Sequence, residues 1–205
     1  MEQTKEITQS TSEKKLLTVL GLLNNCREKL RALYNLFNSN LLKAKTDSQE
    51  MSSLYDEAIN SHNDLKGIAT ALSGKDNREK NIKASKPVVK TTKGNIAEYK
   101  QKFSELYDSF KHAFDDCMKL RADYKNEVVL CCDTYKKIKK DSASKSIEKG
   151  YRSQVNLIKA ILDKIKSLIL NYNKEDEKVE ATKKEFDNMT KLVGTLADNL
   201  CALGV

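Results

Sequence analysis

Residues that interrupt helices are scarce in this chain. Among its 205 residues there is one proline, Pro87, and there are seven glycines and no tryptophan. Proline costs a helix interior about 3 kcal/mol and glycine about 1 kcal/mol, so their scarcity strongly favours helix. Charged residues make up 32% of the chain and hydrophobic residues 39%, which suits a thin bundle in which each helix buries one stripe.

Long apolar runs are also missing. The first fifteen residues are polar, so the sequence predicts no signal peptide. No stretch of eighteen apolar residues exists, because Leu16–Leu23 is too short and Leu157–Leu170 is broken by charged residues. A membrane-spanning helix is therefore not expected. We expect an intracellular, cytoplasmic protein.

The residues that usually perform catalysis are few and scattered. His62 and His112 are the only histidines, and His62 has no metal-ligand pattern around it. His112 has aspartates three and four residues away, which is more common on a charged helix surface than at a metal site. Neither a glycine-rich phosphate loop nor a nucleophile-elbow serine is present. We expect no catalytic residue, no cofactor and no metal, and hence a protein that is not an enzyme.

Five cysteines give an odd count without the spacing of a disulfide framework. They are Cys26, Cys117, Cys131, Cys132 and Cys201. Cys117 and Cys131 fall on an apolar helical stripe, where a thiol behaves as a small hydrophobic group. This arrangement predicts free thiols in a reducing compartment.

Apolar residues at alternating steps of three and four are the strongest positive signal. The longest stripe contains Ile96, Tyr99, Phe103, Leu106, Phe110, Ala113, Cys117, Leu120, Tyr124, Cys131 and Ile138. Glu127 and Thr134 are the polar residues on it, and such groups can set helix register. A narrow stripe of this kind must be covered by other helices.

Similar stripes along the chain predict an all-α fold. We expect an elongated antiparallel helical bundle with coiled-coil-like packing and three long arms, at 13–72, 95–141 and 144–203. Polar interruptions at 46–48 and 171–175 are compatible with continuous helices or with turns that would give four or five helices. Residues 1–11 are predicted to be a disordered tail, and 12–205 a single domain.

Two lysine-rich segments flank the predicted helix breaks. Residues 73–94 contain Pro87 and two glycines, carry a formal charge of +5, and are predicted to be a linker. Residues 136–149 carry +4, within a chain of net charge +8 and pI near 9.1. Candidate contacts to an acidic partner or to lipid are Lys80, Lys83, Lys86, Lys90, Lys93, Lys136, Lys137, Lys139 and Lys140. Because arginines are few, specific nucleic-acid recognition is not favoured.

The segment Leu16–Leu23 is apolar nearly all round. Its apolar residues are Leu16, Leu17, Val19, Leu20, Leu22 and Leu23. Such a helix is either buried between neighbouring helices or available to a membrane or a partner.

Two functions are compatible with these features. The first is a non-enzymatic interaction or scaffold protein that binds a partner protein or itself through its long helices. The second is a membrane-surface module, of the membrane-shaping or pore-forming kind, that uses the basic segments and the apolar N-terminal helix. Under the first hypothesis, the lysines of 73–94 are solvated and removing them leaves partner binding unchanged.

Overall fold

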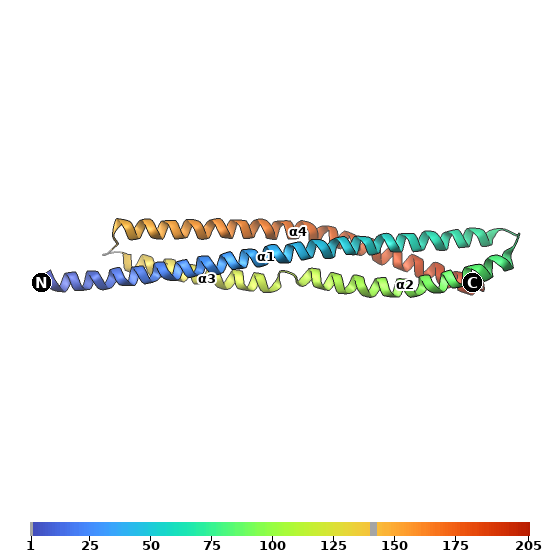
Figure 1. Cartoon of the computed structure of the whole chain (residues 1–205), viewed down its shortest axis with the longest axis horizontal. Coiled ribbons are helices and arrows are strands. Elements are labelled where there is room, and N and C mark those ends of the chain that lie inside the picture. The colour runs from blue at the N-terminus through green and yellow to red at the C-terminus, as the bar shows by residue number, and fades with distance from the viewer. Residues whose placement is uncertain (1, 140–142) are drawn as a thin grey trace. The chain divides into compact units, whose positions relative to one another are not determined.

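Four helices account for nearly all of the described chain (Figure 1). The computed structural model describes residues 2–139 and 143–205, and the side chains from residue 11 onward. The helices are α1 (Glu2–Ser73), α2 (Arg78–His112), α3 (Asp115–Ile138) and α4 (Lys145–Ala202). These described ranges contain no strand, so the predicted all-α class is confirmed.

The chain divides into two compact units, each made of three helical segments. Unit 1 comprises Met1–Leu41 and Ala113–Asn171, which contain the first part of α1, all of α3 and the first part of α4. Unit 2 comprises Leu42–His112 and Tyr172–Val205, which contain the rest of α1, all of α2 and the rest of α4. The single predicted bundle domain therefore consists of two units.

Buried residues recur every seven positions along the longest helices. In α1 they are Leu16, Leu23, Leu30, Phe37, Ala44, Met51, Ala58, Leu65 and Leu72. In α4 they are Ile158, Ile165, Val179, Phe186, Val193 and Leu200, with Tyr172 half-buried in the same series. A seven-residue repeat keeps one helix face against its neighbours over many turns. Both helices consequently run unbroken through 46–48 and 171–175, where turns were the alternative.

Contacts between the helices establish antiparallel packing within each unit. In unit 1, Cys26 of α1 bonds to Glu127 of α3. Asn40, further along α1, bonds to Ala113, which precedes α3 in the chain. The two segments therefore run in opposite directions. In unit 2, Lys93 of α2 pairs with Asp198 of α4, and Lys111 pairs with Asp176. The predicted antiparallel arrangement is confirmed.

The predicted linker at 73–94 is wrong, because only residues 74–77 separate α1 from α2. The turn contains Asn77 at φ 60°, a conformation that asparagine tolerates better than most residues. Most of the former linker belongs to α2, and Pro87 lies inside that helix. Burial of Val89 and Thr92 in unit 2, together with helix-favouring lysines, offsets the cost of the proline.

The predicted continuous helix at 95–141 is also wrong, because it is divided at residues 113–114. Phe114 has φ −106° and ψ −1°, outside regular helix geometry. Carbonyl groups near the break accept side-chain hydrogen bonds. In unit 2, the Tyr172 hydroxyl donates to the Phe110 carbonyl (2.7 Å), and in unit 1 the Asn40 amide donates to the Ala113 carbonyl (2.9 Å). Tertiary contacts thus stabilise this break between the helices, although no glycine or proline lies at residues 113–114.

The predicted disordered tail, residues 1–11, lies almost entirely outside the residues whose side chains the structure describes, which begin at residue 11. It therefore stays a prediction.

Candidate helix-docking groove

Helix α3 of unit 1 is poorly covered by its neighbours. Cys117 and Tyr135 are the buried residues among its 24 positions. Leu120, Tyr124 and Cys131, which the sequence places on the apolar stripe, are half-buried. Exposed apolar side chains on the same helix are Met118, Val129 and Leu130. This helix therefore presents apolar surface on more than one side.

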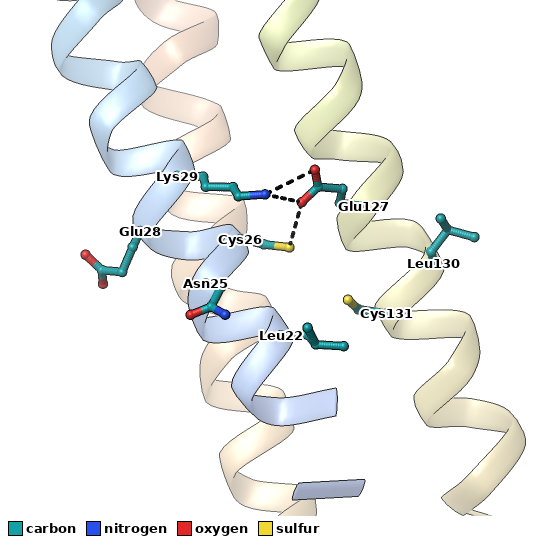
Figure 2. A pocket seen from close by; sticks show the side chains of 8 residues that line it. All are labelled: Leu22, Asn25, Cys26, Glu28, Lys29, Glu127, Leu130 and Cys131. Carbon is teal, nitrogen blue, oxygen red and sulfur yellow. Dashed lines mark hydrogen bonds and ion pairs between the residues drawn. The ribbon is translucent and has the colours of Figure 1, made fainter. Parts of the chain in front are cut away.

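A groove of about 520 Å³ separates α1 from α3 within unit 1. It is lined by Leu22, Asn25, Cys26, Glu28, Lys29, Glu127, Leu130 and Cys131 (Figure 2). Leu22 on α1 is 49% exposed and Leu130 on α3 is 66% exposed. The two leucines thus place accessible apolar surface on both helices that form the groove.

The charged side chains that line the groove all take part in ion pairs. Lys29 donates hydrogen bonds to both Glu127 oxygens, at 2.9 and 3.2 Å, and the Cys26 thiol lies 3.7 Å from the same carboxylate. Hydrogen bonding to Glu127 raises the pKa of Lys29. Glu28, the third charged side chain of the groove, pairs with Arg27 and Arg31, so the surface without an ion-pair partner is mainly apolar. Glu127 joins α3 to α1 through its bonds to Lys29 and Cys26, and its role in setting helix register stays a prediction.

The two thiols in the groove are weak nucleophiles. Burial, reinforced by the charges of Cys131 and Glu127, raises the pKa of Cys26 to about 11. Burial also raises the pKa of Cys131. Both thiols are protonated at neutral pH, and the thiolate is the reactive form. All five cysteines are free, and the described residues contain no group of three or more His, Cys, Asp or Glu side chains that could hold a metal ion.

The structure divides the apolar N-terminal segment into two classes of residue. Leu16, Val19 and Leu23 are buried in unit 1 and Leu20 is half-buried, whereas Leu17 and Leu22 are exposed. The segment is therefore a packed bundle helix rather than a free apolar one. Of its residues, Leu22 lines the groove.

The candidate lysines fall in both units. Lys80, Lys83, Lys86 and Lys90 are exposed on α2 of unit 2, and Lys93 pairs with Asp198 at 2.9 Å. Lys136 and Lys137 are exposed in the last turn of α3, Lys139 lies 3.9 Å from Glu148, and Lys140 lies outside the described residues.

Leu130 was not among the candidate residues predicted from the sequence. It belongs to the apolar run from Val128 to Cys132, which is too long to face one side of a helix. This run could have indicated exposed apolar surface on α3, because five consecutive helical residues cannot all lie on one narrow stripe.

Charge and exposed apolar surface are both concentrated in unit 1. This unit contains 19 Lys and Arg against 12 Asp and Glu, a formal charge of +7, whereas unit 2 contains 18 against 17, or +1. Large exposed apolar residues of unit 1 are Leu17, Leu22, Leu36, Met118, Val129, Leu130, Leu157 and Leu170. Those of unit 2 are Leu42, Val88, Leu192 and Leu203. Unit 1 therefore combines a net positive charge with most of the large exposed apolar side chains.

The chain matches no protein-family model and no curated protein. Among solved structures it is similar to a computationally designed three helix bundle. The two are 19% identical, with a TM-score of 0.33, over 99% of this chain and 93% of that chain. Within the described residues, no helix is long and apolar enough to cross a membrane.

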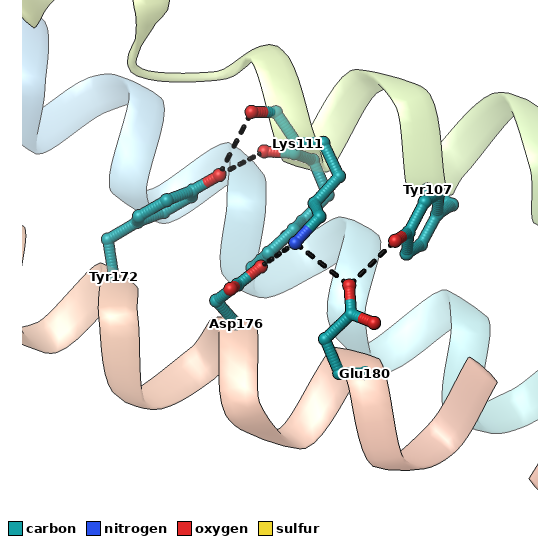
Figure 3. Close-up of polar contacts among 6 residues, drawn as sticks. Tyr107, Lys111, Tyr172, Asp176 and Glu180 are labelled. Carbon is teal, nitrogen blue, oxygen red and sulfur yellow. Dashed lines mark hydrogen bonds and ion pairs between the residues drawn. The ribbon is translucent and has the colours of Figure 1, made fainter. Parts of the chain in front are cut away.

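The densest polar cluster of unit 2 connects α2 to α4 (Figure 3). Lys111 lies 2.6 Å from Asp176 and 2.8 Å from Glu180, and the Tyr107 hydroxyl donates to Glu180 at 2.6 Å. Hydrogen bonds to Asp176 and Glu180 raise the pKa of Lys111, and the bond from Lys111 lowers the pKa of Glu180. Because these groups satisfy one another, the cluster stabilises helix packing rather than providing a free charge for a ligand.

This cluster predicts a pH-dependent contribution to stability. The pKa of Glu180 is lowered in the folded state from its ordinary value of 4.5. Its stabilising effect is therefore present above pH 4.5 and is lost as the pH falls through the lower, folded-state value. We expect the Glu180→Gln variant to unfold at a lower urea concentration than the unmodified protein at neutral pH. The difference should shrink as the pH is lowered below 4.5.

Urea titrations followed by far-UV circular dichroism at several pH values measure this difference. Glu185→Gln provides a control, because Glu185 is exposed and makes no ion pair within the described ranges. A difference for Glu180→Gln that stayed constant from neutral to acidic pH would contradict the assignment.

Proposed function

We propose that this chain is a non-enzymatic helical interaction protein, and that unit 1 binds an amphipathic, acidic helix of a partner protein in the groove between α1 and α3. The observation that supports this proposal most directly is the pair of exposed leucines, Leu22 and Leu130, on the two helices that form a groove of about 520 Å³. Apolar side chains of a docked helix would contact both leucines.

Docking of a helix would also complete the cover of α3. Unit 1 has three helical segments, and a fourth helix in the groove would convert it into a four-helix arrangement. Amphipathic helices bind hydrophobic grooves in this way, with anchors at intervals of three, four and seven residues. The charge of +7 on unit 1 favours acidic residues that flank the apolar face of the bound helix, where they approach unit 1.

Burial of apolar residues in the segment Leu16–Leu23 favours a protein partner over a membrane. Leu16, Val19 and Leu23 already contribute to the core of unit 1. Their insertion into lipid would require that core to open, and burial of such side chains is worth about 1.5–3 kcal/mol each. A helix docked in the groove needs no such opening.

A synthetic peptide tests the proposal. The probe is a fluorescein-labelled amphipathic helix with leucines on one face and glutamates on the other, and binding is measured by fluorescence anisotropy. Leu22→Asp and Leu130→Asp should each weaken binding at least about tenfold, because each places a charge in the apolar contact. Leu192→Asp, a matched change at an exposed leucine of unit 2, should leave binding unchanged.

Two further comparisons sharpen the result. Replacing Lys80, Lys83, Lys86 and Lys90 by glutamine should not alter peptide binding, since these lysines belong to unit 2. Equal losses for Leu130→Asp and Leu192→Asp would refute the assigned groove. Co-sedimentation with anionic vesicles that is abolished by Leu130→Asp, in the absence of peptide binding, would instead establish membrane binding.

A further inference from the structure

Unit 2 has a groove of its own. Carboxylates outnumber lysines along this groove, whereas unit 1 carries a net positive charge. The groove lies between α1 and α2 and has a volume of about 600 Å³. It is lined by Lys43, Asp47, Glu50, Ser53, Leu54, Glu57, Lys102, Glu105, Leu106 and Ser109. Four carboxylates and two lysines surround the apolar side chains of Leu54 and Leu106. A binding partner would therefore need both basic and apolar side chains.

The four carboxylates of this groove take part in no ion pair among the described residues, although two lysines also line it. Asp47 is 7% exposed and accepts a hydrogen bond from the Ser109 hydroxyl at 3.0 Å. In the described part of the chain, Glu50 and Glu57 take part in no ion pair, and Lys102 is paired with Glu98 at 2.7 Å, away from them. The acidic character of the groove is thus available to a basic partner.

Helix α3 in unit 1 carries a surface of complementary chemistry. Met118, Lys125, Val129 and Lys136 are spaced by seven, four and seven residues, so they share one helix face. All four are exposed, and neither lysine forms an ion pair within the described ranges. We call this face the α3 ridge. Asp133 borders it, and Leu130, which lines the groove of unit 1, points in a different direction around the helix.

We propose that the acidic groove of unit 2 binds the α3 ridge of a second copy of this chain. Met118 and Val129 would contact Leu54 and Leu106, while Lys125 and Lys136 would approach Glu50 and Glu57. The groove and the ridge are different surfaces, so each copy of the chain carries one groove and one ridge. Such a heterologous contact generates rings or open filaments rather than a symmetric pair.

Sedimentation velocity and light scattering on the full chain test this inference. At low salt and rising protein concentration, the mass should exceed the 23.2 kDa of one chain, and high salt should return it towards that value. A mass of one chain under all of these conditions would overturn the proposal.

Charge reversal assigns the contact to the two surfaces. The groove variant Glu50→Lys/Glu57→Lys and the ridge variant Lys125→Glu/Lys136→Glu should each associate at least about tenfold more weakly than the unmodified chain. Mixing the two variants should restore association, because the groove of the ridge variant and the ridge of the groove variant are both intact.

Matched controls exclude an effect of net charge alone. Glu177→Lys/Glu185→Lys and Lys83→Glu/Lys90→Glu change the charge by the same amounts at exposed positions outside both surfaces. These controls should associate like the unmodified chain. Equal weakening by the controls, or a mixture that fails to associate while both variants retain their circular-dichroism spectra, would refute the assigned surfaces.

Discussion

Phe37→Ala is expected to lower the free energy of unfolding by about 3–5 kcal/mol, the usual cost of removing a buried aromatic side chain. Phe37 is fully buried in unit 1 and belongs to the seven-residue series of α1. Its ring meets Phe114 edge to face, with the ring centroids 4.9 Å apart. The substitution leaves a cavity beside Phe114, the residue at which the backbone departs from helix geometry.

Urea denaturation followed by far-UV circular dichroism measures this loss. Leu36→Ala is the matched control, since it removes an apolar side chain from the preceding, exposed position of the same helix. The control should change stability by less than about 1 kcal/mol. Similar losses for the two variants would mean that the buried series of α1 has been assigned to the wrong face.

Asp47→Leu is expected to raise the free energy of unfolding by about 1–3 kcal/mol. Asp47 is a buried carboxylate on the packed face of α1, and the Ser109 hydroxyl is its hydrogen-bond donor among the described residues. A buried charge without a counter-ion carries a desolvation penalty that one neutral hydrogen bond offsets only in part. Leucine would replace it with apolar contacts to α2 of unit 2.

The same urea titration tests this second variant. Asp64→Leu, at an exposed position of α1 in unit 2, should change stability by no more than about 0.5 kcal/mol. If Asp47→Leu destabilised the protein instead, the Asp47–Ser109 hydrogen bond would outweigh the cost of burying the carboxylate, and its role would be to hold α1 and α2 in register.

Periodicity identified most of the core residues but not where helices end. Ile96, Phe103, Phe110 and Cys117 were predicted on one stripe, and all four are buried. The same stripe continues across the interruption at Ala113 and Phe114 without a change of phase, so periodicity alone could not locate the break. Pro87 and the nearby lysines predicted a linker, but this segment is part of α2. Its helix is stabilised by the burial of Val89, a tertiary contact that the local sequence does not reveal.

The candidate groove was only partly accessible to sequence reasoning. Leu22 was recognised as apolar on a helix that is apolar nearly all round, and Glu127 as a polar residue on the α3 stripe. Leu130 was missed because its exposure depends on how α3 is rotated against α1. The acidic groove of unit 2 combines residues of α1 and α2 that lie about fifty positions apart in the chain, a pairing that no local pattern contains.

The amino-acid sequence by itself determined that this protein is helical, that it forms an antiparallel bundle, and that an apolar stripe with a seven-residue repeat supplies buried residues in α1, α2 and α4. These properties follow from the scarcity of glycine and proline and from side-chain spacing, which are local. The tertiary structure alone decided the division into two units, the interruption at Phe114 and the exposure of Leu130. Those features depend on contacts such as Phe37 with Phe114 and Asn40 with Ala113, whose free energies arise only when distant segments meet.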